Sequence, residues 1–447
     1  MNGYGLVLGG GGARGSYEVG VWKALREMDI PICAVVGTSV GALNAAMIVQ
    51  GDFETTYKYW TELSTEDVIA SNKRQEEKKK KYVEFLDMAR EVVVSKGLDI
   101  TPLKEMLSEL VDEEKVRESE TEMGMVTFSL TDRKPLSLFK EDIPEGKLVD
   151  YLIASAAFPA FKPQEIDDKL YMDGGLSDTL PISLMINKDI KRIIAVDIEG
   201  PGIYRKYDDT GLEVVYIKPS EGLGAVLDFN GERASKNIQM GYYDTMRKFG
   251  RFKGVKYYVK PDQDIEELKE DLVGTLSVKD FKNMYAYLGI DWASKPNAAK
   301  KLVQEIILRT LKAYSDGKLS TSSVILAMAE ITAERLGIER MRLYTITELI
   351  DAIMETYNGI CESQEFKGMT GELGGIIRSF NPFGREKEFK LDSIEEKFLV
   401  SYRADIDEND EKVKKFRRLV AVALPKVCIA NLFIALVISK RGTPYSR

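Results

Sequence analysis

Residues 32–48 read ICAVVGTSVGALNAAMI, and this stretch decides the fold of the N-terminal part of the chain. Its first five residues, Ile32 to Val36, form an apolar run that is typical of a buried strand. Small and apolar residues follow with helical spacing as far as Ile48. Between them, Gly37-Thr38-Ser39-Val40-Gly41 predicts a sharp strand-to-helix turn that presents Ser39. Glycine on either side suits this turn, because a strained turn brings both Cα atoms against neighbouring backbone.

The chain contains no histidine among its 447 residues. A serine at such a turn normally uses an imidazole as its general base, so catalysis by Ser39 needs a carboxylate or a lysine. Asp173 is the first candidate, because Gly174 and Gly175 follow it and allow a tight turn that presents the carboxylate. Two plainer interpretations stay open at this point: Ser39 as the N-cap of a helix, and Asp173 as a solvated turn residue.

A second strand–loop–helix pattern lies at the N-terminal end of the sequence. Gly5 to Leu8 predicts a short buried strand, and the apolar spacing from Val21 to Leu25 predicts a helix. The loop between them, Gly10-Gly11-Gly12-Ala13-Arg14-Gly15, fits the G-x-G-x-x-G pattern of dinucleotide-binding loops. The next strand ends without the acidic residue that this fingerprint requires. Exposed glycine amides can instead bind the oxyanion of an acyl-transfer intermediate.

The remaining pattern divides the chain into two domains. Apolar strands are predicted at 125–130, 192–198 and 213–217, with helices between them, which indicates a mostly parallel sheet covered on both faces. From about residue 262 onward helical spacing dominates. We therefore predict an α/β domain over 1–262 and an α-helical domain of unknown role over 263–447. Helices of the second domain are expected at 298–314, 322–336, 345–357 and 391–402.

Composition excludes several other classes of protein. The net charge of -8 disfavours nucleic-acid binding as the main activity. Cys33, Cys361 and Cys428 are far apart and odd in number, so neither a disulfide framework nor a zinc site is expected. No carboxylate-rich loop indicates calcium. We expect a metal-independent, cofactor-free protein in a reducing cytoplasm.

The three motifs together resemble the patatin-like phospholipase family. That family carries a Gly-Gly-Gly-x-Arg/Lys-Gly loop, a Gly-x-Ser-x-Gly elbow and an Asp-Gly-Gly/Ala motif in this order, matched here by residues 10–15, 37–41 and 173–175. Three ordered motifs are far more specific than any one of them. Further similarity lies at 99–103, 154–161, 180–182, 223–229 and 241–242. The resemblance covers roughly residues 5–262 and does not extend to the C-terminal region.

The resemblance implies a three-layer α/β/α domain and a serine acyl hydrolase acting on phospholipid or lysophospholipid esters. It implies a Ser39–Asp173 dyad in which Asp173 accepts the Ser39 proton, Ser39 attacks the ester carbonyl, and water hydrolyses the acyl-enzyme. The implied oxyanion hole consists of the amides of Gly10, Gly11 and Gly12. Supporting residues are Arg14, Gly15, Gly37, Val40, Gly41, Gly174 and Gly175. An acyltransferase and a catalytically silent lipid-binding or regulatory protein are alternatives on the same scaffold.

Two segments bear on membrane contact. Residues 419–438 are strongly apolar with basic flanks, but Pro425, Lys426 and Asn431 interrupt them, so a buried helix is favoured over an interfacial helix and a membrane span. The helix-like stretch 82–94 is expected to belong to the core or to form a lid. We expect a lipid substrate, transient contact with a membrane surface and no nucleic acid. The expected location is the cytoplasm, including the inner face of the membrane.

Overall fold

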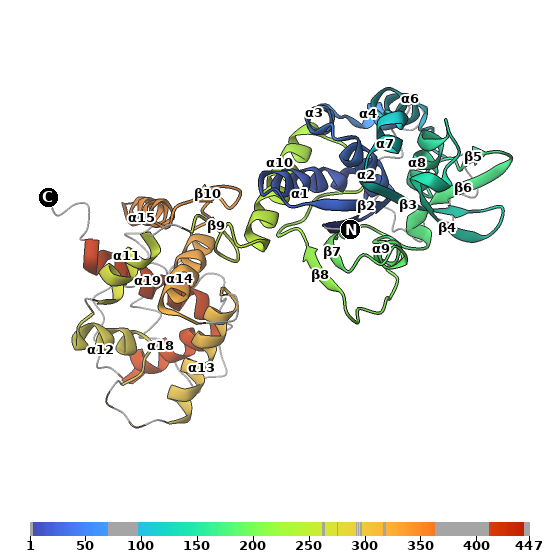
Figure 1. Cartoon of the computed structure of the whole chain (residues 1–447). Coiled ribbons are helices and arrows are strands. Elements are labelled where there is room, and N and C mark those ends of the chain that lie inside the picture. Colours follow the sequence, from blue (N-terminus) through green and yellow to red (C-terminus); the bar gives the residue numbers. More distant parts are fainter. Residues whose placement is uncertain are drawn as a thin grey trace. The chain divides into compact units, whose positions relative to one another are not determined.

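The chain forms two compact units, Met1–Phe249 and Gly250–Arg447 (Figure 1). The computed structural model describes residues 3–69, 97–261, 264–274, 276–291, 293, 295, 297–315, 319–362 and 411–441. The helices predicted at 82–94 and 391–402 lie outside the described residues.

One sheet with helices on both faces makes up the N-terminal unit. Its strands are β1 (Tyr4–Leu8), β2 (Ile32–Thr38), β3 (Glu122–Ser129), β4 (Lys134–Phe139), β5 (Gln164–Ile166), β6 (Lys169–Asp173), β7 (Arg192–Val196) and β8 (Glu213–Ile217). Its α-helices are α1 (Ser16–Glu27), α2 (Val40–Gln50), α3 (Phe53–Glu62), α4 (Thr65–Val68), α6 (Thr101–Leu110), α7 (Glu113–Glu118), α8 (Leu148–Ala156), α9 (Ile182–Asn187) and α10 (Gly231–Lys248). Short 3-10 helices are η1 (Gly12–Gly15), η2 (Lys140–Asp142) and η3 (Gly174–Leu176).

The sheet is mixed. Its strand order is β5-β6-β3-β2-β1-β7-β8, with β4 paired to β3. Strands β1, β2, β3, β7 and β8 are parallel, and they are the five strands that the apolar runs predict. Strands β4, β5 and β6 are antiparallel to their neighbours and were not predicted. Their many exposed positions explain this, because they lack a continuous apolar run.

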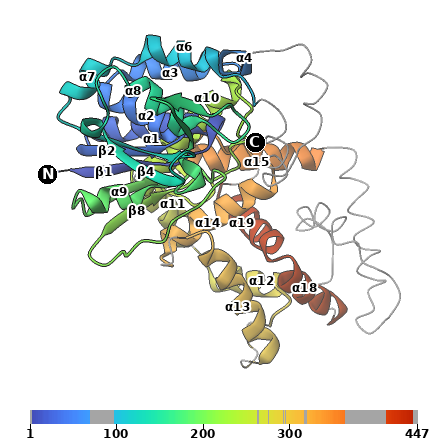
Figure 2. The same cartoon turned by 90° about the vertical axis from the view of Figure 1, so that its right-hand side faces the viewer.

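Helices cover both faces of this sheet, as the two views of Figures 1 and 2 show. Helix α9 covers one face, where alternate strand residues such as Val7, Val36 and Ala195 meet Leu184 in a buried cluster. Helices α1, α2, α8 and α10 lie on the opposite face. Helix α1 packs very closely on α10: a Cβ at Gly20 would lie 1.9 Å from a carbonyl oxygen of α10. The predicted three-layer arrangement is confirmed.

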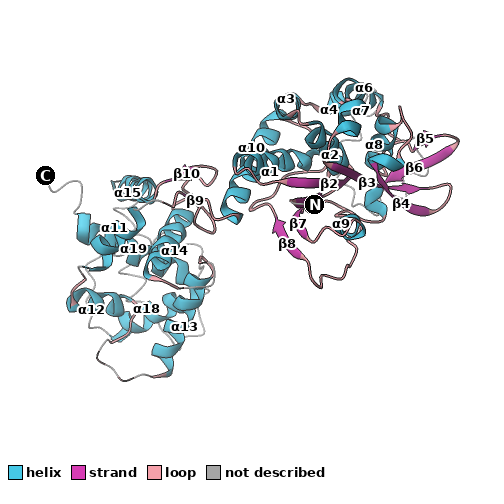
Figure 3. Ribbon diagram, viewed as in Figure 1, coloured by secondary structure: helices cyan, strands magenta, loops and turns pink. Residues whose placement is uncertain are grey.

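The C-terminal unit is almost entirely α-helical (Figure 3). Its helices are α11 (Asp264–Lys269), the π-helix η4 (Glu270–Gly274), α12 (Val278–Tyr287), α13 (Ala298–Lys312), α14 (Thr321–Arg335), α15 (Ile346–Glu362), α18 (Glu411–Ala423) and α19 (Pro425–Arg441). One parallel pair of two-residue strands, β9 (Tyr258–Val259) and β10 (Leu343–Tyr344), accompanies them. The predictions at 298–314, 322–336 and 345–357 correspond to α13, α14 and α15.

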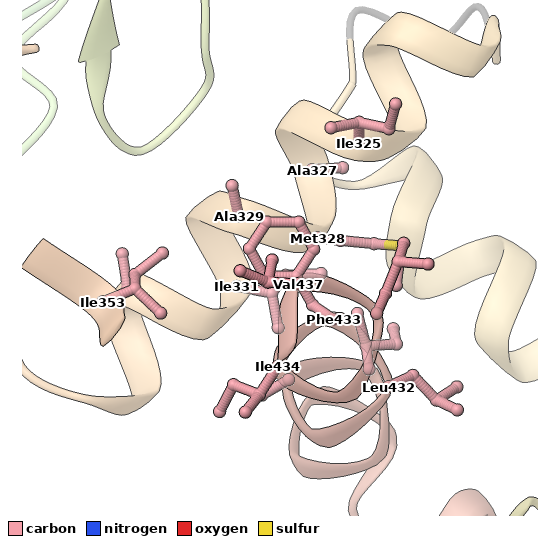
Figure 4. Close-up of a cluster of buried hydrophobic side chains, with 14 of the residues drawn as sticks. Ile325, Ala327, Met328, Ala329, Ile331, Ile353, Leu432, Phe433, Ile434 and Val437 are labelled. Atoms are coloured by element: carbon pink, nitrogen blue, oxygen red, sulfur yellow. The ribbon is translucent and has the colours of Figure 1, made fainter. Parts of the chain in front are cut away.

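The apolar segment 419–438 ends α18 and forms most of α19. Helix α19 is buried in the core of this unit, where Phe433 and Val437 pack near Met328 and Ile331 of α14 (Figure 4). Within the described ranges no single helix is long and apolar enough to cross a membrane. The pair Val413–Ala423 and Pro425–Lys440, bent by 111°, passes the same test together by length and composition alone.

The second unit begins at Gly250, before the boundary predicted after residue 262. Tyr257 and Val259 are fully buried in the C-terminal core. The carboxylate of Glu330, on α14, accepts hydrogen bonds from the backbone amides of Val255, Lys256 and Tyr257 at 2.7–2.8 Å. A buried carboxylate satisfied by backbone amides fixes this segment to α14. No local composition change marks that contact, which explains the difference.

Candidate active site

Ser39 lies at the turn between β2 and α2. Its backbone has φ 56° and ψ -128°, a conformation that costs a non-glycine residue about 1–3 kcal/mol and is typical of functional sites. The residue is 9% exposed. Ser39 occupies the N-cap position of α2, yet its hydroxyl makes no capping hydrogen bond. The plainer interpretation of this serine as a helix cap therefore does not describe the structure.

The glycines on either side make the turn possible. A Cβ at Gly37 would lie 2.2 Å from the carbonyl oxygen of Gly41, and a Cβ at Gly41 would lie 2.5 Å from that of Leu8. Both distances are shorter than real Cβ contacts allow. The chain thus requires glycine at both positions, for the steric reason that the sequence suggests.

The register of the sheet brings Asp173 to Ser39. Strand β4 occupies one edge of β3 from Gly124 to Ser129. The other edge is shared by two strands: β2 pairs with 122–126 in the parallel direction, and β6 pairs with 127–129 in the antiparallel direction. Strands β2 and β6 therefore approach each other end to end, with Thr38 opposite Val126 and Asp173 opposite Thr127. Ser39 follows Thr38 directly.

Asp173 is buried and hydrogen-bonded. The residue is 4% exposed, and its side chain accepts a hydrogen bond from the Gly175 amide at 2.7 Å. Burial raises the pKa of Asp173 from 3.8 to about 6, while hydrogen bonds from the Ser39 side chain and the Gly175 backbone act in the opposite direction. The aspartate is therefore not a solvated turn residue. It is still mostly ionised near pH 7 and is a stronger base than an ordinary aspartate.

The glycine loop follows β1, which pairs with β2 so that Leu8 lies opposite Gly37. The amide of Gly10 donates to the Thr179 carbonyl at 2.9 Å, so it is already engaged. In the part of the chain that the structure describes, the amides of Gly11 and Gly12 have no acceptor. Of the three amides expected to form an oxyanion hole, that of Gly10 is thus engaged, whereas those of Gly11 and Gly12 are available to donate to a ligand. The Val40 amide, at the positive end of the α2 dipole, is a further donor.

The other predicted residues hold these segments together. The Arg14 guanidinium donates to the carbonyl oxygens of Gly224 and Glu199, which anchors the glycine loop to two loops that follow β7 and β8. Gly15 lies against Val40: a Cβ there would be 2.5 Å from the valine side chain. A Cβ at Gly174 would be 2.2 Å from the Val126 carbonyl oxygen. Arg14 therefore fixes the glycine loop by hydrogen bonds, and positions 15 and 174 require glycine because a side chain would not fit.

A largely apolar pocket opens from this point, with about 1020 Å³ of empty space including its mouth. Ser39, Asp173 and the glycine loop form its polar end. The apolar wall comes from α2, α3, α4, α6 and nearby loops: Leu43, Met47, Trp60, Leu63, Val68, Leu103, Met106, Leu107, Leu110, Phe158, Phe161, Val226, Leu227 and Phe229. Such a pocket suits a ligand with one reactive polar group and a long apolar part.

The sequence did not single out several residues that shape the site. The Ser155 hydroxyl, on α8, accepts a hydrogen bond from the Ser39 amide at 3.0 Å and donates to the Val126 carbonyl at 2.7 Å. Thr179 supplies the carbonyl that engages Gly10. Only the family resemblance at 154–161 pointed toward Ser155. Among the described residues no group of three or more histidine, cysteine, aspartate or glutamate side chains is arranged to hold a metal ion.

The N-terminal part of the chain is similar in sequence to known proteins. The family model described as patatin-like phospholipase matches residues 6–186. The neuropathy target esterase sws of Drosophila melanogaster is 31% identical over 206 residues, which cover 44% of this chain and 13% of that protein. The lysophospholipase nte1 of Aspergillus terreus is 65% identical over 43 residues, covering 10% of this chain and 3% of that protein. This chain thus spans only a small part of the length of these relatives.

A solved structure, that of VipD from Legionella pneumophila, aligns with all of this chain and 93% of that chain, at 15% identity and a TM-score of 0.33. The elbow and the glycine loop both lie within the residues that the family model matches. The N-terminal unit therefore contains a patatin-like phospholipase domain, which the family model matches over residues 6–186.

Proposed function

We propose that this chain is a serine acyl hydrolase that cleaves lipid ester bonds through Ser39 and Asp173. One observation carries the proposal: Ser39 and the buried Asp173 carboxyl group, whose pKa the Ser39 side chain lowers, line the same end of an apolar pocket. In a chain without histidine, Asp173 is the acidic residue in the lining of this pocket and is therefore the proposed base. The esterase and the lysophospholipase among its relatives support the same chemistry.

In the proposed reaction, Asp173 accepts the Ser39 proton while Oγ attacks the ester carbonyl carbon. The tetrahedral intermediate then expels the alcohol, which takes the proton back from Asp173, and an acyl-serine remains. A water molecule, deprotonated by the same carboxylate, attacks this ester and releases the fatty acid. The raised pKa of Asp173 supports both proton transfers, because a general base works best when its pKa lies near the working pH.

The amides of Gly11, Gly12 and Val40 are the proposed donors to the oxyanion. A single donor of this kind contributes about 3–4 kcal/mol to transition-state stabilisation. The apolar wall of the pocket supports an acyl chain as the buried part of the substrate. We therefore propose phospholipids or lysophospholipids as substrates. Transient contact with a membrane surface and a cytoplasmic location stay predictions.

The test is fatty-acid release from phosphatidylcholine and lysophosphatidylcholine by the purified full chain. Ser39→Ala and Asp173→Asn should each lower release by about 10³-fold or more, with circular dichroism unchanged. Two matched controls remove the same groups elsewhere: Ser183→Ala on α9, and Asp178→Asn, a buried aspartate whose side chain accepts a hydrogen bond from Ser183. Both controls should keep their activity. Equal activity in all four variants would remove the proposal.

Labelling by a fluorophosphonate and product analysis distinguish the alternatives. A folded wild-type protein whose Ser39 does not react favours a silent lipid-binding protein. Acyl transfer to added glycerol in place of water favours an acyltransferase.

A further inference from the structure

Asn44 joins three elements around the proposed site. It lies one turn into α2, is 4% exposed and lines the pocket. Its Nδ2 donates to the carbonyl oxygen of Gly15 at 3.0 Å and to Oε2 of Glu18 at 2.7 Å. Its Oδ1 accepts from the indole Nε1 of Trp60, on α3, at 3.1 Å. This one side chain therefore bonds the end of the glycine loop, helix α1 and helix α3.

These hydrogen bonds connect the glycine loop to the elbow that carries Ser39, and the proposed reaction depends on the distance between these two parts. Asn44 shares a helix with the elbow, because α2 begins directly after Ser39. Gly15 ends the loop that carries the unengaged Gly11 and Gly12 amides. Gly15 also packs against Val40, so the loop and the elbow already touch, and the Asn44 hydrogen bond fixes how they are aligned. Displacement of a catalytic group by about 1 Å can lower the rate by about 10².

Glu18 orients the Asn44 amide. Glu18 is fully buried, and its Oε1 has no hydrogen-bond partner within the described ranges. Burial raises the pKa of Glu18 well above its usual range, with the Asn44 hydrogen bond and the Gly9 backbone acting in the opposite direction. The neutral acid is thus favoured. A neutral group beside the glycine loop does not repel the negative charge that develops on a bound oxyanion.

We propose that Asn44 is a positioning residue, held in place by Glu18, which sets the distance between the glycine-loop amides and Ser39. The inference rests on the proposed hydrolase chemistry. This positioning role differs from a purely structural role in its expected effect. Loss of the Asn44 donor weakens binding of the transition state and leaves binding of the substrate nearly unchanged.

The first variant is Asn44→Asp, which keeps the size and the acceptor for Trp60 but loses both donated hydrogen bonds. Its kcat for a lysophospholipid should fall about 100-fold, with KM within about threefold. An alkyl trifluoromethyl ketone, whose serine adduct carries an oxyanion, should bind about 100-fold more weakly. Thermal unfolding and circular dichroism report whether the variant folds.

A second pair of variants keeps the test decisive if Asn44→Asp does not fold. Glu18→Leu removes the acceptor that orients Asn44 and should lower kcat about tenfold. Glu18→Gln retains an acceptor oxygen and should restore kcat to within about threefold of wild type. The inference is overturned if the folded variants Asn44→Asp and Glu18→Leu keep kcat and ketone affinity within about threefold of wild type. An inactive wild type would instead refute the proposed function.

Discussion

Lowering the pH should inactivate the protein by protonating Asp173. Burial raises the pKa of this carboxyl group to about 6, and only the carboxylate can accept the Ser39 proton. We therefore expect kcat/KM to rise with pH through about 6 and to level off above about 7. Below the midpoint, each pH unit should lower kcat/KM about tenfold. An ordinary aspartate would place the midpoint near 4.

The same carboxyl group should reduce the stability of the fold as the pH rises. Between about pH 4 and pH 6 the native Asp173 keeps its proton, whereas the unfolded chain, with a pKa of 3.8, has lost it. The stability that Asp173 contributes is thus fully present below about pH 4 and is lost as the pH rises through about 6. The difference between 3.8 and about 6, at about 1.36 kcal/mol per pKa unit, corresponds to about 3 kcal/mol.

Asp173→Asn isolates this effect, because its side chain is neutral at every pH. The assay is urea denaturation of the wild type and the variant at pH 4 and pH 8. Other titrating groups, including Glu18, act in both proteins and cancel in the comparison. From pH 4 to pH 8 the variant should gain about 2.5 kcal/mol relative to the wild type, because the unfolded carboxyl group is still partly protonated at pH 4. A constant difference between the two proteins, with an activity midpoint near pH 4, would refute an active carboxylate whose pKa is raised by burial.

The other predictions concern the elbow, the loop and the pocket. Gly41→Ala should destabilise the N-terminal unit by about 1–3 kcal/mol, because the added Cβ would overlap backbone oxygens. Thermal unfolding measures this loss. The control is Gly359→Ala, whose added Cβ would have no atom within 4 Å and should leave the stability unreduced. Arg14→Lys should lower kcat about tenfold in steady-state assays, because a single ammonium group cannot reproduce the guanidinium bonds to Gly224 and Glu199; unchanged kcat would contradict this role. Leu107→Trp, which fills part of the pocket, should lower kcat/KM for long-chain esters at least tenfold and leave kcat/KM for acetate esters unchanged. An equal loss of kcat/KM on both kinds of ester would show that the acyl chain binds elsewhere.

Local sequence predicted the segments that hold the candidate catalytic residues. Gly37 and Gly41 flank Ser39 because the turn leaves no room for a Cβ, a constraint that adjacent residues express fully. The five parallel strands were predictable because strands buried on both faces are continuous apolar runs. Because the sequence has no histidine, it predicts a carboxylate or a lysine as the base, and the glycines after Asp173 make that residue the first candidate.

Contacts between distant segments could not be predicted in this way. The antiparallel direction of β6, which sends Asp173 toward Ser39 along one edge of β3, depends on a pairing that no local pattern specifies. The engagement of the Gly10 amide depends on the Thr179 carbonyl, far along the chain. Similarly, Asn44 reads as one polar residue on a small-residue helix. Its role depends on Glu18 and Trp60, which lie on two other helices.

Mass spectrometry of the fluorophosphonate reaction tests the central claim most directly. The account predicts that one probe molecule adds to the peptide containing Ser39 in the folded wild-type chain, and that the rate of addition falls at least 100-fold in Asp173→Asn. An unmodified Ser39 peptide, or equal rates in the two folded proteins, would show that the serine and the aspartate do not act as a pair.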